Sequence, residues 1–225
     1  MPDAPVCSTA ALPADWRPWR APSSIGDRRP TKAEMAQAVT ARAISQDVLP
    51  YSTDDASAGH VRLLIVGINP SPWTALVNAP FARPGNRFWP SLAAGGLLER
   101  TVDASRGLST EDERMLAERG IGIVSFVDRP TARADELSRD ELREGGRRLV
   151  ERVRTIRPDA VAVVGITAFR TALRRPRAQM GRQDTADVDG WPEESTLWVL
   201  PNPSGLNAHE TIASLGERWA QAFPP

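Results

Sequence analysis

Cysteine and histidine are nearly absent from this chain of 225 residues. Cys7 is the only cysteine, which excludes an internal disulfide, a cysteine-rich zinc site and an iron–sulfur cluster ligated by cysteines. His60 and His209 are the only histidines. Two histidines are too few for a three-histidine metal centre, and they leave only two candidates for a histidine-dependent catalytic triad.

Long apolar runs and an excess of one charge are missing as well. No stretch approaches 18 consecutive apolar residues, so we expect no membrane-spanning segment, and the N-terminus lacks the apolar core of a secretory signal. The 28 Lys and Arg residues balance 28 Asp and Glu residues. The simplest sign of a nucleic-acid partner, a strongly basic chain, is therefore absent, although a local basic face is sufficient for such binding.

The first part of the chain is rich in proline, which disfavours both helix and sheet. We predict an irregular arm over residues 1–46, with Trp16 and Trp19 held against the body of the protein. Within it, Thr31 and Glu34 have the spacing of a capping box, which predicts a helix from there to about Ile44. Residues 47–225 form the predicted main domain. Six prolines lie in the first thirty residues: Pro2, Pro5, Pro13, Pro18, Pro22 and Pro30.

Four short apolar runs alternate with helical patterns in the main domain. The runs are rich in Val, Ile and Leu and are too short for buried helices, which is typical of parallel strands covered on both faces. We therefore predict a three-layer α/β/α domain around a central, mostly parallel four-stranded sheet. The predicted strands are 61–68, 121–127, 160–166 and 197–200, and the predicted helices are 88–98, 139–156, 168–173 and 211–222.

Similar Asn-Pro loops follow the first and the last predicted strands, at 67–71 and 201–207. Ligands of open α/β sheets bind beyond the carboxyl ends of the strands, so both loops are expected to face one cleft. Asn, Pro, Ser and Gly are also ordinary turn residues, so two plain turns are the alternative. The glycine-rich motifs of nucleotide cradles and the nucleophile elbow of α/β-hydrolases are absent.

An asparagine cannot act as a strong base, but its amide can hold and orient a water molecule. Such weak activation is sufficient only where the leaving group departs readily. The N-glycosidic bond to a pyrimidine fits this requirement, because its transition state resembles an oxocarbenium ion.

Five motifs in order resemble the mismatch-specific uracil/thymine-DNA glycosylases, the Mug/TDG branch of the uracil-DNA glycosylase superfamily. The resemblance extends from about Asp47 to the C-terminal helix. It implies a DNA repair enzyme that flips uracil, and by extension thymine or damaged cytosine, out of a mismatch with guanine and leaves an abasic site. The motifs are Gly67–Ser71, Ala82–Trp89, Val127–Thr131, Glu144–Leu149 and Asn202–Asn207.

The resemblance further implies a monofunctional, monomeric enzyme without metal or cofactor, acting on double-stranded DNA in the cytoplasm of a bacterium. Asn69 takes the catalytic place and positions the hydrolytic water. Asn202 stands where faster uracil-specific relatives have a histidine, which implies slower catalysis. The residues implied to contact the base are Ile68, Pro70, Ser71, Thr74, Phe81, Ser125 and Asn202. Gly205, Leu206 and Asn207 match the wedge that fills the gap left by the flipped nucleotide.

The chain departs from the family pattern at three positions. Ser71 replaces the usual glycine, which predicts a narrower pocket floor and a changed range of bases. Ser125 replaces stronger helper groups, with Asp128 as the nearest carboxylate, expected to pair with Arg129 or a helix cap. Ala208 stands where the wedge arginine is expected. Asn86 and Arg87 are expected to brace the pocket or to reach phosphate. Arg129, Arg133 and His209 are candidates for phosphate contacts, with an ordinary position on the solvated surface as the alternative.

Two other functions remain open on the residues alone. A binding module of the same architecture would recognise a mismatch or a small nucleotide without cleaving it. A hydrolase of free nucleosides would use the same pocket but would not need the wedge at 205–207.

Overall fold

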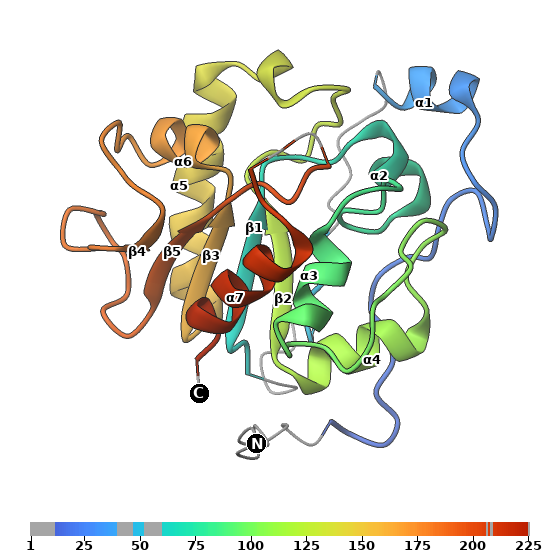
Figure 1. The fold of residues 1–225 in the computed structure, drawn as a ribbon, viewed down its shortest axis with the longest axis horizontal. Helices are drawn as coiled ribbons and strands as arrows, with labels where there is room; N and C mark the ends of the chain where they lie inside the picture. Colours follow the sequence, from blue (N-terminus) through green and yellow to red (C-terminus); the bar gives the residue numbers. More distant parts are fainter. Residues whose placement is uncertain (1–11, 40–46, 52–59, 206, 208, 225) are drawn as a thin grey trace.

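A five-stranded sheet forms the centre of the computed structural model, which describes residues 12–39, 47–51, 60–205, 207 and 209–224 (Figure 1). The strand order is β2-β1-β3-β5-β4. The four predicted strands are all present and parallel, and β4 joins the edge as a short antiparallel strand. The strands are β1 (Leu63–Gly67), β2 (Ile121–Ser125), β3 (Ala160–Val164), β4 (Gly181–Gln183) and β5 (Thr196–Leu200).

Helices cover both faces of the sheet, so the predicted three-layer α/β/α class is confirmed (Figure 1). Alternate residues of β1 face opposite layers: Leu63 and Ile65 pack with α2, α3, α4 and α7, whereas Leu64 and Val66 pack with α5 and α6. The helices are α1 (Lys32–Ala38), α2 (Pro72–Val77), α3 (Phe88–Ala94), α4 (Thr110–Glu118), α5 (Arg139–Ile156), α6 (Ile166–Ala172) and α7 (Ile212–Ala222). Among the described residues, no helix has the length and apolarity needed to cross a membrane.

Several elements differ from the sequence prediction. The sheet has five strands rather than four, and α2 and α4 were not predicted. The expected helix 88–98 ends at Ala94, because Gly96 adopts φ +74°, a left-handed conformation that ends helices. Helix α5 has the predicted bounds, and its capping box at Ser138 and Glu141 is formed. The capping box of α1 is also formed, but the expected continuation over 40–46 lies outside the described residues.

The described part of the N-terminal arm lies against the main domain. The indole N–H groups of Trp16 and Trp19 donate to the backbone carbonyls of Pro50 and Leu49, at 2.8 and 3.1 Å, so the expected anchoring by these two residues is confirmed. The predicted boundary at 46/47 falls at the end of a range that the structure does not describe, so the division into arm and domain stays a prediction.

Candidate active site

A cavity of about 180 Å³ lies beyond the carboxyl ends of β1, β2 and β5. Its walls are the loop after β1, the segment from Pro80 to Asn86, the start of the loop after β5, and residues 131–134. Both Asn-Pro loops therefore line one cavity, as expected for a parallel sheet. The lining includes the eight predicted catalytic and base-contacting residues: Ile68, Asn69, Pro70, Ser71, Thr74, Phe81, Ser125 and Asn202.

Backbone hydrogen bonds extend the pairing of β1 and β2 past the ends of the strands. The loop after β1 thus runs beside residues 126–131, and polar side chains from both loops meet at the cavity. The carbonyls of Gly67, Ile68 and Pro70 accept from the N–H groups of Phe126, Val127 and Thr131, at 3.0, 3.1 and 3.2 Å.

The amide of Asn69 is oriented by this second loop. Its Nδ2 donates to the backbone carbonyl of Arg129 at 2.9 Å and to the hydroxyl of Thr131 at 2.7 Å. A carbonyl oxygen can only accept, so the amide atom facing Arg129 must be the nitrogen. No described residue donates to Oδ1, and this acceptor is left for a ligand or a water molecule.

An ion pair supports the loop after β2, whose residues Arg129 and Thr131 bind the amide of Asn69. Arg129 binds Glu141 at the start of α5 through two bonds, with Nε–Oε1 at 2.7 Å and Nη2–Oε2 at 3.1 Å. Hydrogen bonds from Arg129, together with those from Ser138, lower the pKa of Glu141 to about 2. The carboxylate is therefore ionised at neutral pH. The ion pair fastens the loop after β2 to the N-terminus of α5.

Two further polar groups of the cavity lining, the Nδ2 of Asn202 and the hydroxyl of Ser125, have no partner among the described residues. The Oδ1 of Asn202 accepts from the N–H of Ser204 at 3.0 Å, which leaves its Nδ2 as a donor that no described residue uses. The hydroxyl of Ser125, at the end of β2, makes no hydrogen bond with the described part of the chain. The cavity thus presents three polar groups. They are the acceptor Oδ1 of Asn69 after β1, the donor Nδ2 of Asn202 after β5, and the hydroxyl of Ser125 at the end of β2.

An aromatic ring forms one wall. Phe81 stacks on Phe88, with ring centroids 3.9 Å apart and planes 19° from parallel. Its φ of +54° is rare for a large side chain and costs about 1–3 kcal/mol. At Gly67, a Cβ would lie 3.3 Å from the ring of Phe81 and 3.3 Å from the hydroxyl of Ser125. A side chain at position 67 would therefore push against both walls of the cavity.

Ser71 has a capping role in addition to its place in the cavity wall. Its hydroxyl accepts from the N–H of Thr74 at 3.2 Å, which caps α2, and donates to the Thr74 hydroxyl at 3.1 Å. With φ of −77° and ψ of 163°, its backbone does not require glycine. The effect of Ser71 on the range of bases stays a prediction.

The predicted wedge loop is held by Arg87. The Arg87 side chain donates to the backbone carbonyls of Gly205 and Asn207, each at 3.0 Å, and to that of Glu210. Its own N–H donates to Pro203 at 3.0 Å. Arg87 thus braces this loop and is absent from the cavity lining, whereas the sequence suggested that it braces the pocket or reaches phosphate. Gly205 and Asn207 lie in this loop, whereas the predicted wedge side chain, Leu206, and the adjacent Ala208 lie outside the described residues.

Other residues singled out in the sequence lie away from the cavity lining. Asp128 pairs with Arg148 at 3.5 Å and not with Arg129, which corrects the expected pairing. Arg133 is exposed and paired with Asp135, and His209 is exposed on the wedge loop. In the described ranges, no three His, Cys, Asp or Glu side chains are grouped so that they could hold a metal ion.

Thr131 and Arg83 are among the lining residues that the sequence did not single out. Thr131 stands in a motif that the sequence analysis used, but its contact with Asn69 depends on the pairing of two loops. Arg83 begins a turn closed by the bond from Asn86 N–H to its carbonyl at 3.1 Å. Pro84 and Gly85, with φ of +82°, occupy the middle of that turn, as in type II turns, and the spacing Arg-Pro-Gly-Asn was the available signal.

One comparison with known families bears on this geometry. The family described as the uracil DNA glycosylase superfamily matches residues 54–222, well over half of the chain. The match spans every strand of the sheet and all of the cavity lining.

Proposed function

Because the chain belongs to the uracil DNA glycosylase superfamily, whose members act on DNA, we propose that it hydrolyses the N-glycosidic bond of uracil mispaired with guanine. In this proposal the enzyme is monofunctional and leaves an abasic site, and it also removes thymine or damaged cytosine. It is a monomer that acts on duplex DNA in the bacterial cytoplasm. The observation that carries it is that the fixed amide of Asn69 and the donor of Asn202 line the same cavity.

The water is the nucleophile in this mechanism. The Oδ1 of Asn69 accepts a hydrogen bond from it, while Arg129 and Thr131 hold the amide in that orientation. The water oxygen bonds to C1′ as the C1′–N1 bond breaks, and one water proton passes to solvent. Little nucleophilic push is required, because the sugar develops the character of an oxocarbenium ion before attack.

The leaving base takes the electron pair of the broken bond. Negative charge then develops on the uracil ring, and the Nδ2 of Asn202 donates to it inside the cavity. The ring of Phe81, supported by Phe88, provides a flat surface on which the base stacks. The released uracil anion takes up a proton, so the overall reaction consumes one water and yields neutral uracil and an abasic sugar.

We expect Asn69→Ala to lower the single-turnover rate on a G·U duplex by at least about 100-fold, since removal of one positioned polar group in a catalytic site has effects of that size. Binding to a duplex with an abasic site is expected to stay within about twofold of wild type, because the water-positioning group acts in the chemical step. Cleavage is measured as strand breaks after alkali treatment, and binding by fluorescence anisotropy.

The outcomes separate the three candidate functions. Alkali-sensitive sites in duplex DNA support the glycosylase. Binding without cleavage by the wild-type protein would support a recognition module, and turnover of free deoxyuridine would support a nucleosidase. Full cleavage by Asn69→Ala would reject Asn69 as the water-positioning residue.

A further inference from the structure

The N-terminal arm precedes the family match, which begins at residue 54, yet it is fastened firmly to the main domain. Arg20 pairs with Glu113 of α4 at 2.9 Å, and both side chains are more than nine-tenths buried. Burial raises the pKa of Glu113, and the adjacent Arg20 opposes that shift. Further along, the Ser24 hydroxyl donates to the Leu76 carbonyl at the end of α2, at 2.8 Å. The arm is thus held against α2 and α4 on both sides of residue 22.

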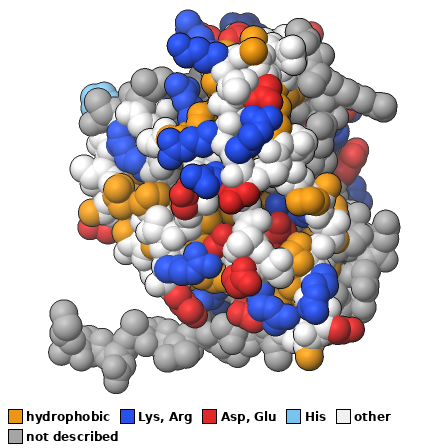
Figure 2. All heavy atoms as spheres, turned by 90° about the vertical axis from the view of Figure 1, so that its right-hand side faces the viewer, with side chains coloured by type: hydrophobic (Ala, Val, Ile, Leu, Met, Phe, Trp, Pro, Cys, Tyr) orange, Lys and Arg blue, Asp and Glu red, His pale blue; other side chains and the backbone are white. Residues whose placement is uncertain are grey.

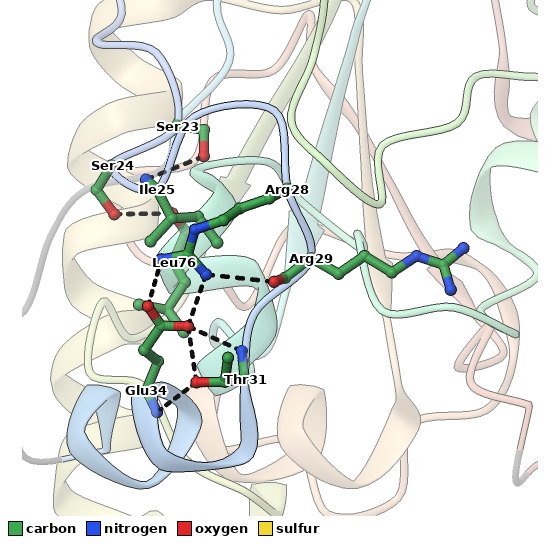
Figure 3. Close-up of polar contacts among 8 residues, drawn as sticks. All are labelled: Ser23, Ser24, Ile25, Arg28, Arg29, Thr31, Glu34 and Leu76. Atoms are coloured by element: carbon green, nitrogen blue, oxygen red, sulfur yellow. Dashed lines mark hydrogen bonds and ion pairs between the residues drawn. The ribbon is translucent and has the colours of Figure 1, made fainter.

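Two neighbouring arginines of the arm have different surroundings (Figure 3). Arg28 donates to both carboxylate oxygens of Glu34, and Glu34 also caps α1 through Thr31. Arg29 extends away from this network, and its side chain makes no hydrogen bond or ion pair with any described residue (Figure 3). Its neighbour Pro30 is buried, so the backbone beside this free guanidinium is anchored.

Arg29 lines a hollow of about 280 Å³ next to the catalytic cavity. The two share the wall formed by Phe81, Arg83 and Asn86. Arg83 is exposed and, within the described part of the chain, its side chain is unpaired. One carboxylate, Asp103, also lines the hollow; hydrogen bonding by Ser105 lowers its pKa, and the charges of nearby arginines, including Arg29, add to that effect.

The surface around the arm is rich in positively charged side chains. Figure 2 shows the side of the molecule that carries α1, α2 and α4, and Lys and Arg side chains predominate over its upper part. The cavity lies beyond the carboxyl ends of β1, β2 and β5, and Arg83 lines both this cavity and the hollow beside Arg29. A chain with no net charge therefore carries, near the cavity, two arginines whose side chains have no hydrogen-bond or ion-pair partner among the described residues.

We propose that Arg29, together with Arg83, binds backbone phosphates of the DNA strand beside the flipped nucleotide, so that the N-terminal arm is part of the DNA-binding surface. The proposal rests on the proposed function and extends it to a segment outside the family match. The wall at 81–86 separates the cavity from the hollow beside Arg29, so a strand whose base enters the cavity across this wall brings its phosphates near both arginines. Arginine suits such a contact, because its planar guanidinium matches phosphate oxygens with two donors.

The test compares Arg29→Gln with Arg28→Gln, which removes the same formal charge one residue away. The probe is a duplex with a tetrahydrofuran abasic analogue opposite guanine, and its affinity is measured at several salt concentrations. For Arg29→Gln we expect the slope of log affinity against log salt to fall by about 0.9, the value for one lost phosphate contact. For Arg28→Gln we expect the wild-type slope, since Glu34 already neutralises Arg28.

Equal slopes for wild type and Arg29→Gln would overturn the proposal, and so would equal reductions in both variants, which would indicate a diffuse charge effect. Thermal melting checks that both variants remain folded. The proposed function has a separate readout, because a wild-type protein that binds the probe but never cleaves uracil-containing DNA would contradict the glycosylase and leave the slope comparison valid.

Discussion

At the scale of single residues, the role proposed for the Asn69 amide requires one of its two orientations, which neighbouring residues determine. An asparagine amide presents an acceptor on one side and two donors on the other, and only the acceptor orients a water for attack on C1′. The Arg129 carbonyl and the Thr131 hydroxyl engage Nδ2 and thereby leave Oδ1 as the acceptor that no described residue uses. Thr131 is 3% exposed, so water cannot readily take its place.

Thr131→Val keeps the shape of the side chain and removes this acceptor. We expect the single-turnover rate on a G·U duplex to fall about tenfold, since a hydrogen bond of about 1–1.5 kcal/mol no longer holds the amide. Thr131→Ser retains the hydroxyl and is expected to restore the rate to within about threefold of wild type. The affinity for abasic DNA is measured in parallel and should change little in either variant. A fall of the same size in Thr131→Ser would indicate a packing role and contradict the positioning role.

At the scale of elements, helix α5 supports the site through close approaches at two glycines. A Cβ on Gly145 would overlap the carbonyl of Phe126, which follows β2, and a Cβ on Gly146 would overlap the carbonyl of Ala172 at the end of α6. These approaches place the N-terminal half of α5 beside the loop after β2, where Glu141 binds Arg129. Larger residues would move the helix away from the loop.

Gly146→Ala is expected to lower the free energy of unfolding by about 1–3 kcal/mol, because the added methyl group overlaps backbone atoms that cannot rotate away. Urea denaturation gives the measurement. Arg147→Ala is the matched control, since Arg147 is exposed on the next position of the helix, and its effect should stay within about 0.5 kcal/mol. Equal stability of the two variants would show that α5 and α6 are not in such close contact.

At the scale of the whole molecule, all parts of the proposed site lie at one end of the sheet. The loops after β1, β2 and β5 meet there, Arg87 holds the loop at 203–210 beside the turn at 83–86, and the arm reaches the same end. The residues proposed for catalysis and those proposed for phosphate binding therefore lie at one end of the sheet, in two linings that share Phe81, Arg83 and Asn86.

This arrangement predicts a dependence on the base opposite uracil. We expect single-turnover cleavage of uracil to be about tenfold or more faster opposite guanine than opposite adenine, because extrusion costs least at a mismatch and a weak catalyst cannot offset the difference. The rates are measured on duplexes that differ only in the opposing base, with thymine, hypoxanthine and etheno-cytosine opposite guanine as further substrates. Equal rates opposite guanine and adenine would reject mismatch specificity and leave the glycosylase activity intact.

Local sequence determined much of this fold. The four parallel strands were predicted from short runs of Val, Ile and Leu, since only a strand covered on both faces is apolar at every position. Capping boxes predicted the starts of α1 and α5, because the bonds that form them join residues three apart. The common cavity of the two Asn-Pro loops followed from topology, as parallel strands end at one edge, and the catalytic role of Asn69 stays a prediction.

Only the tertiary structure decided the rest. The bond between Asn69 and Thr131 joins residues 62 apart, and the ion pair that fastens the arm, between Arg20 and Glu113, joins residues 93 apart. Strand β4 is three residues long and is stabilised by pairing with β5, which no local pattern reveals. Composition likewise gave no sign of a DNA-binding face, because net charge sums over the chain, whereas binding depends on which cations the fold leaves unpaired beside the cavity.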